Sequence, residues 1–181
     1  MSNLTKKALL AAFGELIEEK PFNKITITDL TEKCGLNRMT FYYHFDNIYE
    51  VMIWGLEMQM REACKDCVNY ENWKTGYLRI FYFALERKKY IKKIFQTIEQ
   101  EHLERYLNKI AERMVVSVID DKIGDKVLDE DDRLFTAQIC SHVLTGTLVS
   151  WISRGMKEDP EIIVKRTGRL LDGMIEKTVN E

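Results

Sequence analysis

The chain contains few residues that interrupt helices, and it has no long apolar run. Only two prolines and nine glycines occur among its 181 residues, and between them apolar side chains recur at the 3.6-residue period of an α-helix. We therefore predict an all-α protein. No segment reaches the roughly 18 uncharged apolar residues that a transmembrane helix needs, so we expect no association with a membrane.

The N-terminal segment lacks the uninterrupted apolar core of a signal peptide. It starts with a pair of lysines, but Glu15, Glu18 and Glu19 break the apolar run that follows them. The pattern is typical of an amphipathic helix over about residues 4–19. We therefore expect a cytoplasmic protein.

Cysteine is also too sparse for a disulfide framework. The four cysteines fall within predicted helices and are Cys34, Cys64, Cys67 and Cys140. Cys64 and Cys67 form a C-x-x-C pair, but a zinc ribbon needs a second such pair, and a redox site needs an adjoining strand. A phosphate-binding glycine loop, a nucleophile elbow and paired catalytic carboxylates are lacking too. We expect no metal, no cofactor and no enzyme activity.

The chain has no excess of positive charge. Its net charge is −2, which argues against a protein that coats nucleic acid without specificity. Residues 1–50 carry six basic and seven acidic side chains. If this segment binds DNA, its positive potential must therefore lie on one face.

Residues 24–45, KITITDLTEKCGLNRMTFYYHF, have the pattern of a helix, a glycine turn and a second short helix. Thr26, with Asp29 three residues later, predicts a capping box at the start of the first helix. Gly35 suits a turn that requires a positive φ. Asn37 stands where its side chain can cap the second helix.

The same segment separates an apolar set of residues from a polar set. The residues spaced to meet in a small core are Ile27, Leu30, Cys34, Leu36, Phe41 and Phe45. The residues left outside it are Thr28, Arg38, Thr40, Tyr42, Tyr43 and His44. A short helix over residues 38–44 with outward hydroxyls, phenols and a guanidinium suits the DNA major groove. Arg38 is the best candidate to bind a guanine; the alternatives are that Arg38 is a solvated surface charge and that Tyr42, Tyr43 and His44 close the core.

The stretch Ile25–Phe45 resembles the DNA-binding segment of the TetR-type family of bacterial transcription regulators. The order and spacing that carry the resemblance are those of Gly35, Leu36, Thr40, Phe41, Tyr42 and Phe45. It implies DNA contacts from Thr28, Asn37, Arg38, Met39, Thr40, Tyr42, Tyr43 and His44. Position 48 departs from the family: it is Ile, where a lysine usually donates to a phosphate, so affinity and its salt dependence should be weaker.

The resemblance also implies a larger helical domain that binds a small molecule and dimerises through its last two helices. The stretch YYHFDNIY at residues 42–49 and LVSWISRGMKEDPE at residues 148–161 further resemble a subgroup that includes regulators of dihydroxyacetone kinase operons. We therefore predict a helix-turn-helix DNA-binding domain at residues 1–50 and a helical regulatory and dimerisation domain at residues 51–181.

Apolar periodicity predicts the helices of the rest of the chain. They cover about residues 48–69, 73–86, 90–98, 100–119, 132–155 and 160–179. The acidic segment at residues 120–133 is expected to be a solvated loop. Pro160 is expected to begin the last helix, where its missing N–H does no harm.

The penultimate helix carries two apolar faces. One face consists of Leu134, Ala137, Leu144, Leu148 and Trp151, and the other of Phe135, Ile139, Val143, Val149 and Ile152. Such a helix needs two partners, and its own domain supplies only one of them. We predict a four-helix homodimer interface formed by Leu144, Leu148, Trp151, Ile163, Leu170 and Met174.

Aromatic and polar residues in the predicted regulatory domain, residues 51–181, predict an effector cavity. The candidate lining residues are Trp73, Tyr77, Phe81, His102, Tyr106, Cys140 and His142. The alternative is that the aromatic residues are ordinary core and the histidines are satisfied side chains on helices.

Together these features predict a homodimeric regulator, a repressor or an activator, that binds double-stranded palindromic operator DNA. A small-molecule effector or a coregulator protein would change its operator affinity. The alternative is a helical protein-interaction module that keeps the helix-turn-helix fold of residues 1–50 without reading DNA, which the negative net charge favours.

Overall fold

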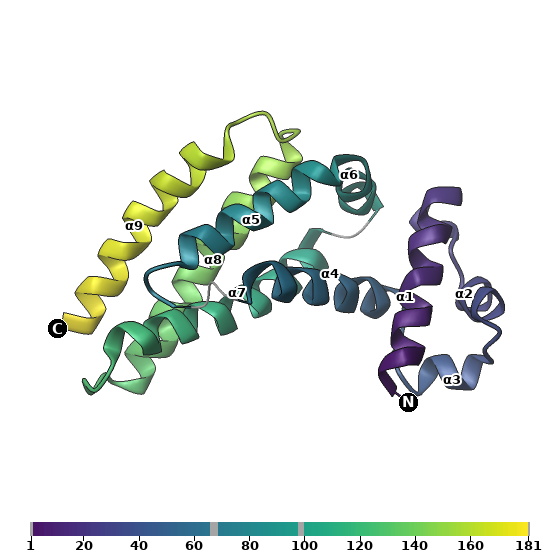
Figure 1. The fold of residues 1–181 in the computed structure, drawn as a ribbon, viewed down its shortest axis with the longest axis horizontal. Coiled ribbons are helices and arrows are strands. Elements are labelled where there is room, and N and C mark those ends of the chain that lie inside the picture. The colour runs from purple at the N-terminus through teal and green to yellow at the C-terminus, as the bar shows by residue number, and fades with distance from the viewer. Residues whose placement is uncertain (1, 66–68, 98–99, 181) are drawn as a thin grey trace. The chain divides into compact units, whose positions relative to one another are not determined.

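The computed structural model describes residues 2–65, 69–97 and 100–180, and all its regular elements are helical (Figure 1). Within these ranges it contains nine α-helices, one short 3-10 helix and no strand, so the predicted all-α class is confirmed. The elements are α1 (Ser2–Glu19), η1 (Phe22–Lys24), α2 (Ile27–Cys34), α3 (Arg38–Tyr42), α4 (Ile48–Cys64), α5 (Trp73–Glu86), α6 (Lys88–Thr97), α7 (Gln100–Ile123), α8 (Glu130–Ser153) and α9 (Pro160–Asn180). None of the helices described is long and apolar enough to cross a membrane.

Most of the predicted helices occur close to their expected bounds. Helix α5 covers the predicted residues 73–86, and Pro160 begins α9 as expected. Helix α4 is shorter than predicted, because it ends at Cys64 rather than near residue 69. Helix α6 begins at Lys88 and so includes two of the basic residues that were expected to precede it.

The acidic segment at residues 120–133 is not the solvated loop that its composition predicts. Helix α7 continues to Ile123 and α8 begins at Glu130, so only a short turn remains between them. Arg133 of α8 joins the two helices, because its Nε lies 2.6 Å from Asp120 Oδ1 of α7. Its Nη1 also lies 2.9 Å from Glu130 Oε1 in the first turn of α8 itself. Acidic residues in the first turn of α8 are also favoured by the positive end of the helix dipole.

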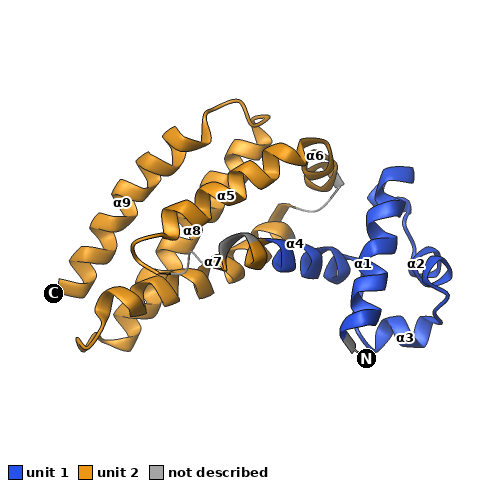
Figure 2. Cartoon of the chain, viewed as in Figure 1, with its two compact units in different colours: residues 1–59 blue, residues 60–181 orange. Residues whose placement is uncertain are grey.

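The chain divides into two compact units, residues 1–59 and residues 60–181 (Figure 2). The division falls inside α4, nine residues beyond the domain boundary that the sequence predicts. The first unit packs α1, α2 and α3 around a small apolar core. Its fully buried side chains include Leu9, Phe13, Ile17, Leu30 and Phe41.

The second unit is built on the pair α7 and α8, which pack against each other along most of their lengths. Helix α9 packs on α5 and α8, while the short α6 contacts α5 and α8. Figure 1 shows α5, α8 and α9 running beside one another within this unit. The fully buried side chains here include Phe81, Ile94, Ile119, Ala137 and Trp151.

A glycine turn ends α8 and leads into α9. Gly155 has a φ of 89° and Met156 a φ of 58°. The backbone N–H of Met156 donates to Trp151 O, and that of Gly155 donates to Ile152 O, both at 2.9 Å. These are the two bonds of a Schellman motif. The indole Nε1 of Trp151 also donates to Glu158 O at 2.9 Å, so one buried side chain ties the turn to the core.

Candidate nucleic-acid interface and regulatory cavity

The predicted capping box is present at the start of α2. Asp29 N donates to Thr26 Oγ1 at 3.1 Å, and Thr26 N donates to Asp29 Oδ2 at 2.7 Å. Lys20 Nζ lies 2.7 Å from the same carboxylate oxygen. The lysine and the two Thr26 donors hold the pKa of Asp29 down at about 2. The carboxylate therefore stays ionised at neutral pH and keeps the first helix of the motif capped.

The turn between α2 and α3 also has the predicted chemistry. Gly35 adopts a left-handed conformation with a φ of 63°, and Leu36 N donates to Thr31 O at 2.8 Å. Asn37 Oδ1 accepts from Thr40 N at 2.8 Å and from Thr40 Oγ1 at 3.0 Å. Helix α3 is thus capped as expected, but it ends at Tyr42, two residues before the predicted end.

Phe41 anchors α3 to the core of the first unit. It is fully buried, and its ring centroid lies 5.6 Å from that of Tyr42 and 6.1 Å from that of Phe45. Leu30 and Phe45 are buried as predicted, whereas the core candidates Ile27, Cys34 and Leu36 are only half-buried. The side of α3 opposite Phe41 remains outside the core.

The predicted DNA-contacting residues lie on this outer side. Six of them are exposed, namely Thr28, Asn37, Arg38, Met39, Tyr42 and Tyr43, while Thr40 and His44 are half-buried. Tyr43 is 83% exposed, so it does not close the core. Arg38 Nη2 lies 3.5 Å from Tyr42 Oη, which places a guanidinium and a phenol side by side on one turn of the helix.

Two lysines of the first unit are engaged by carboxylates rather than free for a ligand. Lys33 Nζ lies 2.8 Å from Glu19 Oε1 and 3.1 Å from Glu15 Oε2, and these acids raise its pKa. Lys20 is paired with Asp29. Arg38 is therefore the cation best placed on the exposed side of α3.

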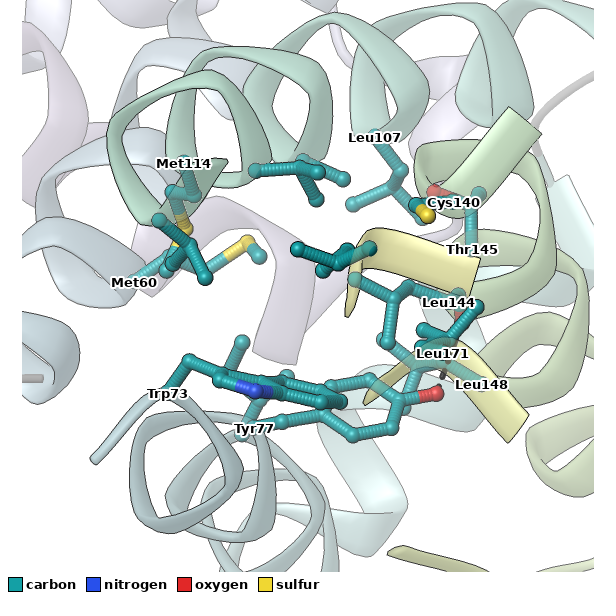
Figure 3. A pocket seen from close by; sticks show the side chains of 15 residues that line it. Met60, Trp73, Tyr77, Leu107, Met114, Cys140, Leu144, Thr145, Leu148 and Leu171 are labelled. Atoms are coloured by element: carbon teal, nitrogen blue, oxygen red, sulfur yellow. Dashed lines mark hydrogen bonds between the residues drawn. The ribbon is translucent and has the colours of Figure 1, made fainter. Parts of the chain in front are cut away.

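The second unit contains an apolar cavity of about 50 Å³ between α4, α5, α7, α8 and α9. Its lining residues are Met60, Trp73, Tyr77, Ile80, Leu107, Ala111, Met114, Val115, Val118, Cys140, Leu144, Thr145, Leu148, Leu171 and Ile175. Figure 3 shows Trp73 and Tyr77 along one side, Met60 and Met114 at one end, and Cys140 near Leu107. No charged side chain belongs to this lining.

The polar atoms of the cavity wall are neutral or already bonded. Tyr77 Oη donates to Leu144 O at 2.8 Å, and Trp73 Nε1 donates to Asp172 Oδ1 at 3.3 Å. Burial raises the pKa of the Cys140 thiol to about 11. The cavity therefore offers an uncharged, mostly carbon and sulfur surface.

Three of the predicted pocket residues line this cavity, and three do not. Trp73, Tyr77 and Cys140 belong to the lining. Phe81 is instead fully buried core, with its ring centroid 4.7 Å from that of Trp151. Tyr106 is absent from the lining.

His142 is also absent from the lining. It is exposed, and its Nδ1 lies 2.6 Å from Gln138 O, one turn earlier on α8. The position of this side chain on the outer face of α8 is why it does not reach the cavity. The side chain of His102 lies outside the described residues.

The predicted dimer interface needs a larger correction. Leu144, Leu148 and Trp151 are buried within the second unit, the first two at the cavity. They contact their own protomer and therefore offer little surface to a partner, while the interface itself stays a prediction. The exposed apolar residues of α8 and α9 are Leu134, Phe135, Ile139, Ile162, Leu170 and Met174, and Ile163 is half-buried.

Comparison with known families decides the identity of the two units. Residues 6–53 match the model described as "Bacterial regulatory proteins, tetR family", and residues 71–173 match one described as "Transcriptional regulator C-terminal region". The chain belongs to the tetR family. Because its family consists of transcription regulators rather than enzymes, the prediction that this tetR-family chain is not an enzyme is confirmed.

Curated relatives of this tetR-family chain are themselves regulators. The HTH-type dhaKLM operon transcriptional activator DhaS of Lactococcus lactis subsp. lactis (strain IL1403) is 28% identical over 94 residues, covering 52% of the chain and 50% of the relative. The uncharacterized HTH-type transcriptional regulator YxbF of Bacillus subtilis (strain 168) is 24% identical over 180 residues, covering 93% and 44%. The chain thus spans about half the length of these curated relatives.

A solved structure shows the same fold. The dihydroxyacetone kinase operon activator DhaS superposes with a TM-score of 0.65 at 23% identity, covering 96% of the tetR-family chain and 97% of its own. This likeness confirms a helix-turn-helix head followed by a helical domain. The resemblance to the dihydroxyacetone kinase operon subgroup, predicted from the sequence, agrees with both findings.

The C-x-x-C pair noted in the sequence falls largely outside the described part of the chain. Cys67 lies outside the described residues, as does the side chain of Cys64; among the residues that the structure does describe, no cluster of three His, Cys, Asp or Glu side chains could hold a metal.

The cavity residues Leu107, Met114 and Val118 were not predicted as lining. Their signal was the apolar stripe of α7, which indicates burial but not a cavity.

Proposed function

We propose that the protein is a dimeric transcription regulator that binds a palindromic operator through α2 and α3. The observation that carries the proposal is the outer side of α3, where Arg38, Met39, Tyr42 and Tyr43 are exposed on a helix anchored by the buried Phe41. In a dimer the two α3 helices would enter successive major grooves about 34–36 Å apart. Binding a chromosomal operator would place the protein in the cytoplasm.

Each exposed side chain has a role that its chemistry suits. The Arg38 guanidinium can donate two hydrogen bonds to O6 and N7 of a guanine. Met39 can contact a thymine methyl group, and the hydroxyls of Thr28, Tyr42 and Tyr43 can donate to phosphates. Asn37 and Thr40 orient this surface, because their side chains bond each other and hold the start of α3.

A second candidate function is a protein-interaction module that has kept the head's fold. The observation that favours it is the charge of the first unit, where residues 1–59 hold six basic and eight acidic side chains and hence a net charge of −2. Such a surface repels a polyanion unless its cations are locally concentrated.

Selection of genomic DNA fragments by the purified full chain separates the two functions. The regulator predicts recovery of fragments that share a palindrome, and an Arg38→Ala variant that does not enrich them. No shared palindrome, together with a stable complex with another protein, would support the interaction module instead.

The homodimer interface that we propose consists of the exposed apolar residues of α8 and α9. Phe135 and Leu170 are each 63% exposed, and single apolar side chains are normal at a surface whereas a contiguous set indicates a partner. We expect Phe135→Glu to convert a dimer to a monomer, because a two-fold interface would receive the buried charge twice.

Light scattering after gel filtration tests this prediction by measuring the molar mass of each variant in solution. The matched control is Val127→Glu, which introduces the same charge at a fully exposed apolar residue in the turn between α7 and α8. It should leave the mass unchanged. Equal masses for the wild type and Phe135→Glu would refute the proposed interface.

We further propose that the cavity binds a small, uncharged effector. A charged group would lose its hydration without finding a counter-charge among the lining residues. Ligand pockets usually measure roughly 300–1,000 Å³, so an effector of more than a few heavy atoms would move the walls of the 50 Å³ cavity. Such movement is a means of coupling occupancy to operator affinity, typically by about 1–3 kcal/mol.

A thermal-shift panel of short alcohols, ketones, simple aromatics and phosphorylated sugars tests the cavity. An occupant at about 100 times its Kd would stabilise the wild type by about 2.7 kcal/mol. The shift should be lost in Ala111→Val, which adds two methyl groups to the lining. Equal shifts in the two proteins, or a response confined to the phosphorylated compounds, would contradict the proposed ligand class.

A further inference from the structure

Helix α6 carries the densest cluster of positive charge in the chain. The segment Arg87–Thr97, RKKYIKKIFQT, contains five basic residues and no acid. Arg87 is the C-cap residue of α5, and we call the four lysines of α6 itself, Lys88, Lys89, Lys92 and Lys93, the α6 basic face. By contrast, residues 60–181 as a whole contain 21 basic and 21 acidic side chains, so this concentration is local.

The opposite side of α6 attaches it to the second unit. Ile91 and Ile94 are buried, and the helix contacts α5 and α8. Lys89 and Lys92 are exposed, and each stands two residues before one of the buried isoleucines, which places it about 200° around the helix from that side chain. The structure therefore presents these ammonium groups on a firmly packed helix rather than on a loop.

Part of this charge is already engaged within the protein, because Arg87 is paired with Glu86 and Lys93 has an intramolecular interaction. Among the residues that the structure describes, Lys88, Lys89 and Lys92 have no carboxylate partner. Arg87 lies 3.2 Å from Glu86 Oε2, with its guanidinium 4.2 Å from the Phe83 ring centroid.

The spacing of these lysines lowers the stability of α6 taken as an isolated helix. Lys88 and Lys92, like Lys89 and Lys93, stand four residues apart, where like charges on a helix repel each other. Lys88 and Lys89 also occupy the first turn of α6, where the helix dipole favours acids and disfavours cations. A surface that weakens its own helix in two ways is better explained by an anionic partner than by solubility alone.

The first unit, residues 1–59, supplies little positive charge for the DNA that it is proposed to bind. Its net charge is −2, Lys20 and Lys33 are held by acids, and position 48 is Ile. Duplex DNA carries one negative charge per roughly 1.7 Å of its axis. It is therefore the polyanion whose charge density matches a row of closely spaced lysines, and the proposed function brings it to this protein.

We infer that the α6 basic face is a second DNA-contacting surface, which binds backbone phosphates and carries no base specificity. This inference rests on the proposed function, since it requires that the head brings the chain to duplex DNA. It implies that phosphate affinity and base reading are divided between two parts of the chain, with the first in α6 and the second in α3.

The test compares the salt dependence of DNA binding in two charge-matched double variants of the full chain. One is Lys89→Gln with Lys92→Gln; the control is Lys109→Gln with Lys157→Gln, which removes two other exposed lysines of the second unit. The probe is a mixed-sequence duplex of roughly four helical turns, which requires no known operator. Affinity is measured from about 50 to 200 mM salt.

We expect the slope of log K against log salt to become shallower by about 1 to 2 per bound chain in the α6 variant, because each lost phosphate contact removes about 0.9. The control should keep the wild-type slope. The melting temperature of the α6 variant should equal or exceed that of the wild type, since its helix loses repulsion.

Equal slopes for the two double variants would overturn the inference. If an acidic protein bound to the wild type and not to the α6 variant while the DNA slopes remained equal, the face would be a protein-binding surface. Failure of the proposed function has a different signature: selection from genomic DNA by the full chain would recover no shared palindrome, whatever the α6 variant shows.

Discussion

Replacing Trp151 by alanine is expected to lower the free energy of unfolding by about 3–5 kcal/mol, the range for removal of a buried tryptophan from a core. The indole is fully buried, with its ring centroid 4.7 Å from that of Phe81. It also donates to Glu158 O in the turn between α8 and α9. The substitution therefore leaves a cavity and releases the turn that joins these helices.

Urea unfolding at a fixed protein concentration measures this loss, because dimerisation makes apparent stability depend on concentration. Trp151→Phe keeps an aromatic ring but removes the N–H donor, and should lose less than Trp151→Ala. Tyr43→Ala removes an exposed aromatic side chain and should change stability by less than about 0.5 kcal/mol. A loss below about 1 kcal/mol in Trp151→Ala would show that the turn does not depend on the indole.

The head could be predicted from the sequence because its shape follows from interactions between near neighbours. Thr26 and Asp29 bond each other three residues apart, and Asn37 caps a helix that begins at the next residue. Gly35 occupies the left-handed conformation that a β-carbon disfavours. Each of these features depends on a residue type and a short spacing, both of which are visible in the chain itself.

Which residues of the second unit are buried was harder to predict, because burial there depends on packing between helices that are distant in the sequence. Helix α8 has apolar residues on two sides, and its sequence does not say which side faces α5, α7 and α9. The structure buries Leu144 and Leu148 and exposes Phe135, so the side of α8 from which interface residues were predicted is the side that packs within the unit.

An ion pair between residues far apart in the sequence also explains why the predicted loop at residues 120–133 is largely helical. Asp120 and Arg133 are separated by thirteen residues and bind each other across the α7–α8 turn, and Arg133 lowers the pKa of the Asp120 carboxyl. An acidic stretch that is typical of a solvated loop therefore became the ends of two helices. The acidic composition of this segment indicates only that its side chains prefer water. The pairing of Asp120 with Arg133 depends instead on how α7 and α8 pack together.

Replacing Arg38 by alanine is expected to weaken binding to the recovered palindrome by about 1–3 kcal/mol per half-site, the discrimination that a bidentate contact to guanine provides. In a two-fold complex the loss occurs twice. Arg38 is the cation exposed on α3, and its position beside the Tyr42 hydroxyl restricts where the guanidinium can point. Fluorescence anisotropy with the palindrome and with an unrelated duplex measures the specific and the non-specific affinity.

The ratio of these two affinities tests the role of Arg38 more sharply than either affinity alone. Arg38→Ala should lower the ratio, whereas Lys24→Ala removes an exposed cation of the same unit and should leave it unchanged. Arg38→Lys keeps the positive charge but loses the planar pair of donors, so it should retain non-specific binding while losing most of the specificity. If Arg38→Ala lowered both affinities equally, the side chain would contact a phosphate, and the base reading would lie with Met39 and the tyrosines of the same helix.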